Sequence, residues 1–141
     1  MILFSSALEF NVNKNIMINL IIDAATDKIF FKIISDNESY TSAFPNNREN
    51  FDKFVKLLFK FLNQYKITIE DIKNVFINMG PGKFSGIRVS IATAKALSVT
   101  NRLNLYGFNS NQLIDKNYNK ILDLYKNGLL KKNLIKPIYS R

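Results

Sequence analysis

Three glycines and a proline lie within seven consecutive residues, between an apolar run and a segment rich in small residues. This stretch, Gly80-Pro81-Gly82-Lys83-Phe84-Ser85-Gly86, follows a strand expected at residues 74–78 and precedes a helix expected at residues 87–99. So many glycines with a proline demand a special backbone path. The stretch therefore predicts a tight turn from a buried strand into a helix, and Ser85 is placed to cap that helix.

The same turn has a second interpretation as an anion site. Free N–H groups at a helix start, with Lys83 beside them, could hold an anion. Known phosphate loops match poorly, because Phe84 follows Lys83 where G-x-x-x-x-G-K-[ST] requires Ser or Thr. The spacing from Gly82 to Gly86 is also one residue too long for G-x-G-x-x-G. A structural turn is the favoured interpretation and anion binding the alternative.

The periodicity of the rest of the chain predicts a single α/β domain. Strands are expected at 18–22, 29–34, 39–44, 74–78 and 103–108, and helices at 49–65, 87–99 and 109–126. A short helical turn capped by Thr68 is expected before the fourth strand. Three strands in a meander followed by alternating helices and strands indicate a mixed sheet.

The residue types exclude several classes of protein. The chain has 141 residues with no cysteine and no histidine, which excludes disulfide scaffolds, Cys/His zinc sites, thiol nucleophiles and histidine bases. Its formal charge of +9 favours encounters with polyanions, although the coding bias of an AT-rich genome is an equal explanation. Since no uncharged run approaches the ~18–20 residues of a membrane span, we expect a cytoplasmic protein without membrane contact.

The glycine-rich stretch, extended to Arg88 and followed by Ile91-Ala92-Thr93-Ala94-Lys95-Ala96-Leu97, resembles the signature of the TsaB (YeaZ) family. That signature reads G-P-G-S-F-T-G-L-R and then I-A-x-A-K-G-L. Asp23-Ala24-Ala25-Thr26 is similar to the family's D-T-S-T after its first strand, and Pro137-Ile138-Tyr139-Ser140-Arg141 is similar to its terminal P-x-Y-L-R. The resemblance covers Met17 to about Leu113, and the last five residues.

This resemblance implies the fold of an actin-like ATPase (ASKHA, ribonuclease H-like) lobe, with a mixed β-sheet and flanking helices. Typical members have a second lobe of similar size, which is expected to be largely missing here. Residues 17–128 would form the single lobe and residues 129–141 a tail with the terminal P-x-Y-x-R motif. Residues 1–16 would be an extension of doubtful status, because translation starts at either Met1 or Met17.

The implied function is that of a non-catalytic scaffold subunit. It would heterodimerise with the TsaD threonylcarbamoyltransferase and support formation of N6-threonylcarbamoyladenosine (t6A) at position 37 of tRNAs reading ANN codons. The TsaE ATPase would join the assembled complex, and tRNA would be contacted within it. ATP, threonylcarbamoyl-adenylate and metal would bind to partner subunits, with no cofactor or metal on this chain alone. The resemblance leaves open a homodimer through the same surface when the partner is absent.

Alternative functions remain open at this point. A stand-alone actin-like nucleotide-binding protein would need ATP affinity without a partner, and a small basic RNA-binding module would need tRNA affinity with a steep salt dependence. A decayed copy without function is the third alternative.

The first hairpin supplies the candidates for a degenerate phosphate site, Asp23 and Thr26. Ala25 stands where actin-like ATPases have a glycine, and its Cβ obstructs the approach of a phosphate to the backbone. Asp23 is interpreted first as a turn residue that accepts nearby N–H groups, and second as a contact to magnesium-bound water.

Two further groups of candidates follow from the resemblance. The family-motif loop comprises Gly80, Pro81, Gly82, Phe84, Ser85, Gly86 and Arg88. In the family, the first two helices pack against the partner, and apolar side chains on more than one face of the helix at 49–65 agree with such a shared surface. The candidate partner interface comprises Phe51, Phe54, Val55, Leu58, Phe61, Arg88, Ala92 and Lys95. Burial of these helices within the chain itself is the alternative.

Overall fold

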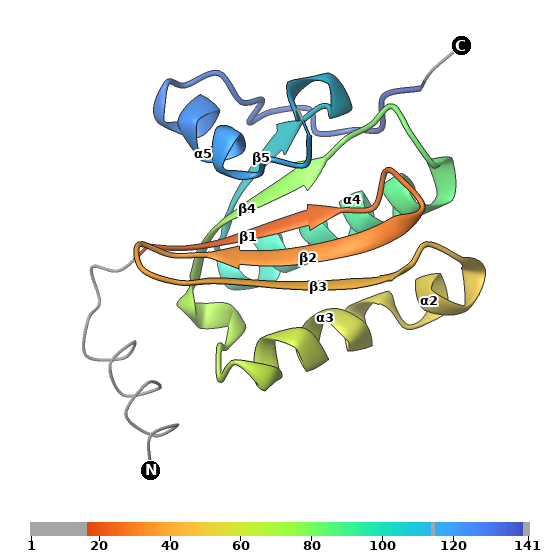
Figure 1. Cartoon of the computed structure of the whole chain (residues 1–141), viewed down its shortest axis with the longest axis horizontal. Helices are drawn as coiled ribbons and strands as arrows, with labels where there is room; N and C mark the ends of the chain where they lie inside the picture. Colours follow the sequence, from red (N-terminus) through yellow and green to blue (C-terminus); the bar gives the residue numbers. More distant parts are fainter. Residues whose placement is uncertain (1–16, 114, 140–141) are drawn as a thin grey trace.

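A computed structural model describes residues 17–113 and 115–139 of the chain (Figure 1). Its centre is a five-stranded sheet in the order β3-β2-β1-β4-β5. The strands are β1 (Ile18–Asp23), β2 (Lys28–Ile34), β3 (Ser39–Pro45), β4 (Ile72–Asn78) and β5 (Asn104–Phe108). β1 to β3 form an antiparallel meander, whereas β4 pairs in parallel with both β1 and β5. The predicted mixed sheet is therefore confirmed. The expected extension at residues 1–16 lies outside the described residues, as do Ser140 and Arg141 of the terminal motif.

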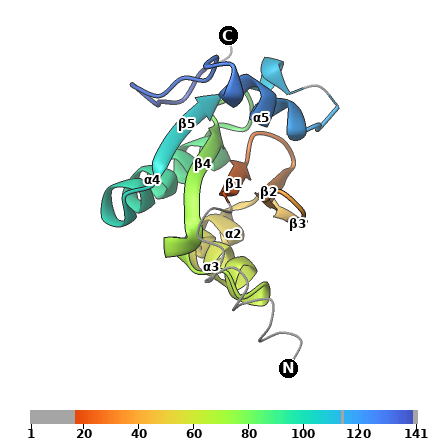
Figure 2. The same ribbon diagram turned by 90° about the vertical axis from the view of Figure 1, so that its left-hand side faces the viewer.

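Helices cover both faces of this sheet (Figures 1 and 2). α3 and α4 pack on one face, and α5 packs on the other. The helical elements are α2 (Arg48–Asp52), α3 (Phe54–Gln64), η1 (Ile69–Asp71), α4 (Phe84–Asn101), η2 (Ser110–Gln112) and α5 (Asn119–Lys126). None of the helices in the described part of the chain is long and apolar enough to cross a membrane.

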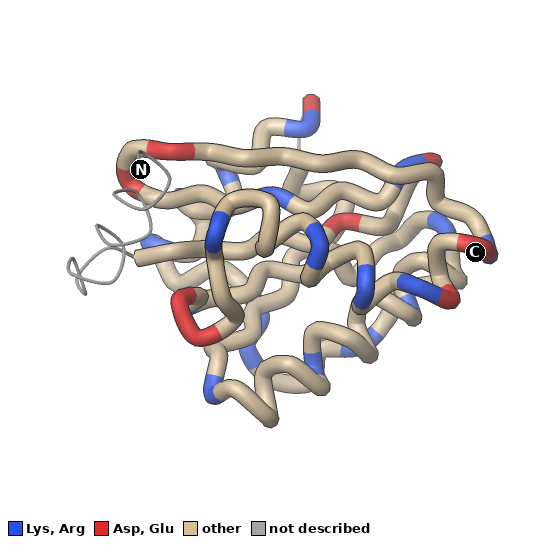
Figure 3. The backbone as a smooth tube through the Cα atoms, turned by 90° about the horizontal axis from the view of Figure 1, so that it is seen from below, with Lys and Arg blue, Asp and Glu red and all other residues tan. Residues whose placement is uncertain are grey.

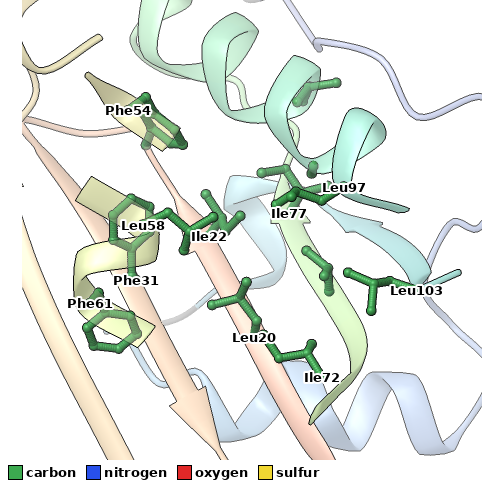
Figure 4. Packing of buried hydrophobic residues seen from close by; sticks show 14 of the residues in the cluster. Leu20, Ile22, Phe31, Phe54, Leu58, Phe61, Ile72, Ile77, Leu97 and Leu103 are labelled. Atoms are coloured by element: carbon green, nitrogen blue, oxygen red, sulfur yellow. The ribbon is translucent and has the colours of Figure 1, made fainter. Parts of the chain in front are cut away.

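Alternation along the strands divides the core into two clusters. Leu20 and Ile22 of β1 face α3 and α4, whereas Ile21 between them faces α5. On the α3 side, the Phe31 ring lies 5.4 Å from the ring of Phe54 and 6.0 Å from the ring of Phe61, as Figure 4 illustrates. The sheet is thus buried on both faces in its central strands.

Two of the expected helices differ from the structure. The helix expected at 49–65 is two helices, because the backbone leaves helical geometry at Lys53. The prediction of a helix at 109–126 is wrong for the first half of that segment. Asn109 and Gln112 exchange side-chain and backbone hydrogen bonds that close a single 3-10 turn. Asp115 and Lys116 then adopt positive φ angles of 52° and 58°, so α5 starts only at Asn119.

The two predicted caps have different outcomes. Thr68 and Asp71 form the expected capping box at η1. The prediction for Ser85 is wrong, because α4 already begins at Phe84, and Ser85 lies inside its first turn. The N-cap position is Lys83, which makes no side-chain capping bond. Backbone contacts of the glycine loop, described next, hold the start of this helix.

Candidate functional site

The glycine loop lies directly against the first hairpin. The Lys83 N–H donates to the Ala25 carbonyl oxygen at 2.8 Å. A Cβ added to Gly82 would lie only 2.2 Å from that oxygen, and one added to Gly86 only 2.6 Å from the Ala24 carbonyl oxygen. Real side chains do not make such short contacts, so glycine is required at both positions for the loop to seal against the hairpin.

Further contacts fix the remainder of the loop. Gly80 has a φ of +103°, which favours glycine, and the Gly80–Pro81 peptide is cis. Ser110 donates its N–H to the Gly80 carbonyl oxygen and its hydroxyl to the Pro81 carbonyl oxygen, each at 2.8 Å. The Ile138 N–H donates to the Met79 carbonyl oxygen at 2.8 Å, so the C-terminal tail joins the same assembly.

Asp23 is the last residue of β1, directly before the turn of the first hairpin, and it is fully buried. Its Oδ1 accepts the Ala25 N–H at 3.1 Å and the Asn78 side-chain amide at 3.0 Å. Its Oδ2 accepts the Tyr118 hydroxyl at 2.7 Å. The favoured interpretation of Asp23 as an acceptor for nearby N–H groups is confirmed. The two more distant donors tie the end of β4 and the start of α5 to the hairpin.

The residues of this hairpin do not fit a nucleotide phosphate. Ala25 is packed under Gly82, and both carboxylate oxygens of Asp23 already accept hydrogen bonds within the chain. The Asn46 side-chain amide donates to the carbonyl oxygens of Ala24 and Thr26, at 2.8 and 2.6 Å. These two hydrogen bonds occupy the carbonyl oxygens of the hairpin turn. Thr26 is exposed, but its hydroxyl already accepts from Lys116 at 3.1 Å. Within residues 17–113 and 115–139, no cluster of three or more carboxylates is arranged to hold a metal ion.

The accessible part of the motif lies at the start of α4. Phe84 is 47% exposed, and the Arg88 guanidinium carbon lies 5.1 Å from the centre of its ring. The Tyr139 ring packs against the same phenylalanine, with 5.1 Å between centroids. A shallow open groove of about 370 Å³ is lined by Phe84, Ser85, Arg88, Val89 and Ala92. This groove is a surface onto which another molecule could dock.

The predicted interface residues divide into two groups. Val55, Arg88, Ala92 and Lys95 are exposed on the outer sides of α3 and α4, and Phe51 is half-buried. The prediction is wrong for Phe54, Leu58 and Phe61, because all three are at most 2% exposed and pack inward on the sheet. A stripe that repeats every three or four residues can face a sheet or a partner, and here the sheet takes it.

Comparison with known proteins places these features in a family. A family model described as "TsaD: tRNA N6-adenosine threonylcarbamoyltransferase" matches residues 46–118, more than half of the chain. The chain belongs to this family, in its TsaB (YeaZ) branch. The matched region begins at Asn46 and ends at Tyr118, so it contains the glycine loop and two of the side chains that close the hairpin.

Individual relatives agree with this membership. The tRNA threonylcarbamoyladenosine biosynthesis protein TsaB of Buchnera aphidicola subsp. Schizaphis graminum is 31% identical over 91 residues, covering 64% of this chain and 43% of that protein. The structure of YeaZ from Pseudomonas aeruginosa superimposes with a TM-score of 0.64 at 12% identity, over 79% of this chain and 50% of the other. A second structure, of an uncharacterised protein with similarity to the peptidase YeaZ from Pseudomonas aeruginosa, has a TM-score of 0.64 at 13% identity, over 78% and 48%.

These matches confirm the predicted α/β fold with a mixed sheet and flanking helices, which the chain shares with the YeaZ structures. The chain spans about half the length of the TsaB and YeaZ proteins that it matches.

Sequence reasoning missed several residues of the hairpin assembly. Tyr118 gave no signal, because it is 95 residues away from Asp23 and lay in a segment interpreted as continuous helix. Asn78 could have been found, since it ends the strand that pairs in parallel with β1 and so lies beside Asp23. Asn46 follows the third strand, and only the tertiary structure brings it to the hairpin.

Replacement of Tyr118 by phenylalanine tests the buried network. The Tyr118→Phe change leaves Asp23 Oδ2 buried without its donor, which is expected to lower the free energy of unfolding by about 1–3 kcal/mol. Urea denaturation followed by circular dichroism measures this loss. Tyr125→Phe is the matched control, because no hydrogen bond of the Tyr125 hydroxyl is found within the described residues. Equal stability of the two variants would contradict the role given to Tyr118.

The same variant is expected to alter the alkaline stability profile. Burial, together with the Asp23 carboxylate, raises the pKa of the Tyr118 hydroxyl well above its usual range. The folded chain therefore keeps a proton that the unfolded chain releases near its ordinary pKa of about 10. This stabilisation is complete below about pH 10 and declines as the pH rises further. The decline should be shallower in Tyr118→Phe. A residual slope should remain, because a hydrogen bond to Glu38 raises the pKa of Tyr40 to about 12.

Proposed function

We propose that this chain is a non-catalytic subunit for t6A synthesis that heterodimerises with a TsaD threonylcarbamoyltransferase. The product would be t6A at position 37 of tRNAs reading ANN codons. The matched relative is named as a tRNA threonylcarbamoyladenosine biosynthesis protein, and the matching family model is described as a threonylcarbamoyltransferase. The observation that carries the proposal is the glycine loop. The loop packs closely against the hairpin, and the residues that follow it at the start of α4 line an open groove.

The non-catalytic role is supported by the residues available to the chain. The sequence contains neither cysteine nor histidine, so it offers no thiol nucleophile and no imidazole base. The buried carboxylate of the hairpin, Asp23, is held in internal hydrogen bonds and is not accessible to a substrate. We therefore assign ATP, threonylcarbamoyl-adenylate and the metal ion to partner subunits. The TsaE ATPase and tRNA would join through the assembled complex.

The proposed contact surface is the outer side of α3 and α4. Val55 on α3 and Phe84 on α4 expose about half of their surfaces, and Ala92 leaves room for another helix to approach. An aromatic and an arginine beside a groove are typical centres of protein interfaces. The pairing of Arg88 with Phe84 presents the guanidinium in a fixed position.

Co-purification with the TsaD protein encoded in the same genome tests this function directly. The tagged chain and TsaD, expressed together, are expected to elute from a sizing column as a one-to-one complex. The complex should form t6A on tRNA when TsaE, ATP and threonylcarbamoyl-adenylate synthesis are supplied, and TsaD alone should not. Separate elution of a folded chain, with full t6A formation by TsaD alone, would contradict the proposal.

Arg88→Ala is expected to weaken TsaD binding about tenfold or more without lowering stability. The side chain is exposed and forms no ion pair among the described residues, so the fold does not depend on it. Its loss removes a charged contact at the rim of the groove. Lys126→Ala on α5, on the opposite face of the sheet, is the control of equal charge. Titration calorimetry with TsaD measures both, and an unchanged dissociation constant for Arg88→Ala would remove this residue from the interface.

A further inference from the structure

Tyrosine and lysine side chains gather where β5, the end of α5 and the C-terminal tail meet, in the upper part of Figure 2. The rings of Tyr106 on β5 and Tyr125 on α5 lie 5.1 Å apart, on the side of the sheet opposite α3 and α4. The backbone of Lys131 exchanges two hydrogen bonds with Gly107 of β5, at 2.7 and 3.1 Å, so the tail lies along the edge of the sheet. We call this cluster the tyrosine–lysine patch, and it comprises Tyr106, Tyr125, Lys126, Lys131 and Lys132.

One face of the Tyr106 ring is open to a planar ligand. Phe76 of the neighbouring strand β4 stacks on the ring, with 5.6 Å between the ring centres and 26° between the planes. Because β5 is an edge strand, the other face of the ring is directed away from the sheet. The side chain found there is Lys132, whose Nζ lies 5.5 Å from the ring centre. Lys132 is exposed, so its flexible side chain can move aside and leave the ring face to a nucleobase.

The lysines around the two rings are available to bind phosphates. Residues 115–139 contain six lysines and two aspartates, and all six lysines are exposed. Within residues 17–113 and 115–139, Lys126, Lys131 and Lys132 form no ion pair. Unpaired amino groups beside an aromatic ring supply the two contacts on which binding of single-stranded RNA depends, phosphate neutralisation and base stacking.

Charge alone does not select this side of the sheet, since blue segments also follow α3 and α4 on the other side in Figure 3. The distinguishing feature is the pair of tyrosines. Their hydroxyl groups form no hydrogen bond within the described residues, so they can contact a ribose or the edge of a base. An acidic protein surface would pair with the lysines and leave the open face of the Tyr106 ring unused. The composition of the patch therefore favours RNA over a protein.

We propose that the tyrosine–lysine patch binds RNA. An unpaired base stacks on Tyr106, and Lys126, Lys131 and Lys132 neutralise the neighbouring phosphates. The inference rests on the proposed function, because it takes tRNA as the RNA. The surface proposed above for TsaD lies on α3 and α4, across the sheet from the two tyrosines, so the chain can contact TsaD and tRNA at the same time.

Fluorescence anisotropy with a labelled, unmodified tRNA that reads ANN codons tests this inference on the full chain. Lys131→Glu/Lys132→Glu should weaken binding at least tenfold at about 50 mM NaCl. The slope of log affinity against log salt should become shallower by about 1 to 2, because up to two phosphate contacts are lost. Lys28→Glu/Lys66→Glu makes the same change of charge at exposed positions outside the patch, and should bind within about twofold of wild type.

Two substitutions of Tyr106 test the stacking contact separately from charge. Tyr106→Leu removes the ring and should weaken tRNA binding at least fivefold. Tyr106→Phe keeps the ring, and should bind more tightly than Tyr106→Leu. Circular dichroism and urea denaturation check that each variant is folded. Affinities are compared at a temperature at which all of them are native, so that a loss of binding is not a loss of folding.

TsaD binding is measured on the same variants, which separates the possible outcomes. Unchanged tRNA affinity in Lys131→Glu/Lys132→Glu and Tyr106→Leu, with a TsaD complex that forms t6A, overturns the RNA inference and leaves the proposed function intact. Equal weakening by Lys28→Glu/Lys66→Glu also overturns the inference, because net charge would then explain the binding. Loss of TsaD binding with unchanged tRNA affinity assigns the patch to a protein and overturns it as well. If no TsaD complex forms but tRNA binding still depends on the patch, the proposed function fails and the RNA site stands.

Discussion

Phe54→Ala is expected to lower the free energy of unfolding by about 3–5 kcal/mol, because it removes a buried ring from a packed core. The Phe54 side chain is 2% exposed, and its ring meets Phe31 edge-on at 5.4 Å. The remaining cavity would lie between α3 and the centre of the sheet. Thermal or urea denaturation of the isolated chain measures the loss. The affinity of the folded fraction for TsaD should change little.

The next residue along the helix provides the matched control. Val55 is 49% exposed, so Val55→Ala should keep stability within about 0.5 kcal/mol of wild type. If Val55 contacts TsaD, its truncation should instead weaken the complex. The two neighbours would then have opposite effects, one on folding and one on binding. A stable Phe54→Ala protein with impaired binding would show that α3 turns its aromatic side outward, contrary to the structure.

Gly82→Ala is the second change with a large expected effect. The new Cβ would lie 2.2 Å from the Ala25 carbonyl oxygen and 2.8 Å from the Ala25 Cβ. Both obstacles belong to the first hairpin, so one backbone segment must move for the methyl group to fit. Overpacking typically costs about 1–3 kcal/mol, and we expect the upper end of this range here because the obstacles are backbone and Cβ atoms rather than the end of a flexible side chain. The midpoint of urea denaturation should fall accordingly, and the Phe84–Arg88 groove should lose affinity for TsaD because the start of α4 is displaced.

Ser85→Ala separates this steric effect from a general sensitivity of the loop. Ser85 is exposed and lies inside the first turn of α4 without a capping bond, so its truncation should leave stability nearly unchanged. If Gly82→Ala and Ser85→Ala lowered the free energy of unfolding by similar amounts, the close packing of Gly82 against the hairpin would not be what stabilises the loop.

Local patterns were sufficient for most of the secondary structure. Apolar and β-branched runs predicted all five strands, and the strand–helix alternation predicted the mixed sheet. The glycine spacing predicted a tight turn into a helix, because few other residues allow such a path. The 109–126 segment failed for a local reason as well. Its apolar spacing fits a helix, but the positive φ angles at Asp115 and Lys116 have no signal in a hydrophobic pattern.

The candidate site was predictable only in part, because its key contacts join distant segments. The hairpin and the loop were each recognised, yet their direct contact through Gly82 and Ala25 depends on the tertiary fold. The donation from Tyr118 to Asp23 likewise spans 95 residues. The assignment of Phe54, Leu58 and Phe61 of α3 to an interface failed because a helical stripe has the same spacing whether it faces a sheet or a partner. Burial of Phe54, Leu58 and Phe61 decides the question.

The return of the tail to the glycine loop affects where the protein can be labelled. Ile138 is hydrogen-bonded to Met79, and Tyr139 packs on Phe84 at the edge of the groove. A tag or dye fused after Arg141 would thus be attached within two residues of the proposed docking surface and would obstruct the binding it is meant to report. The turn between β2 and β3, at Asp36 and Asn37, lies at the opposite end of the sheet, because β2 runs antiparallel to β1. A reporter inserted there leaves the groove open, so that position is the suitable attachment point for every binding measurement on this chain.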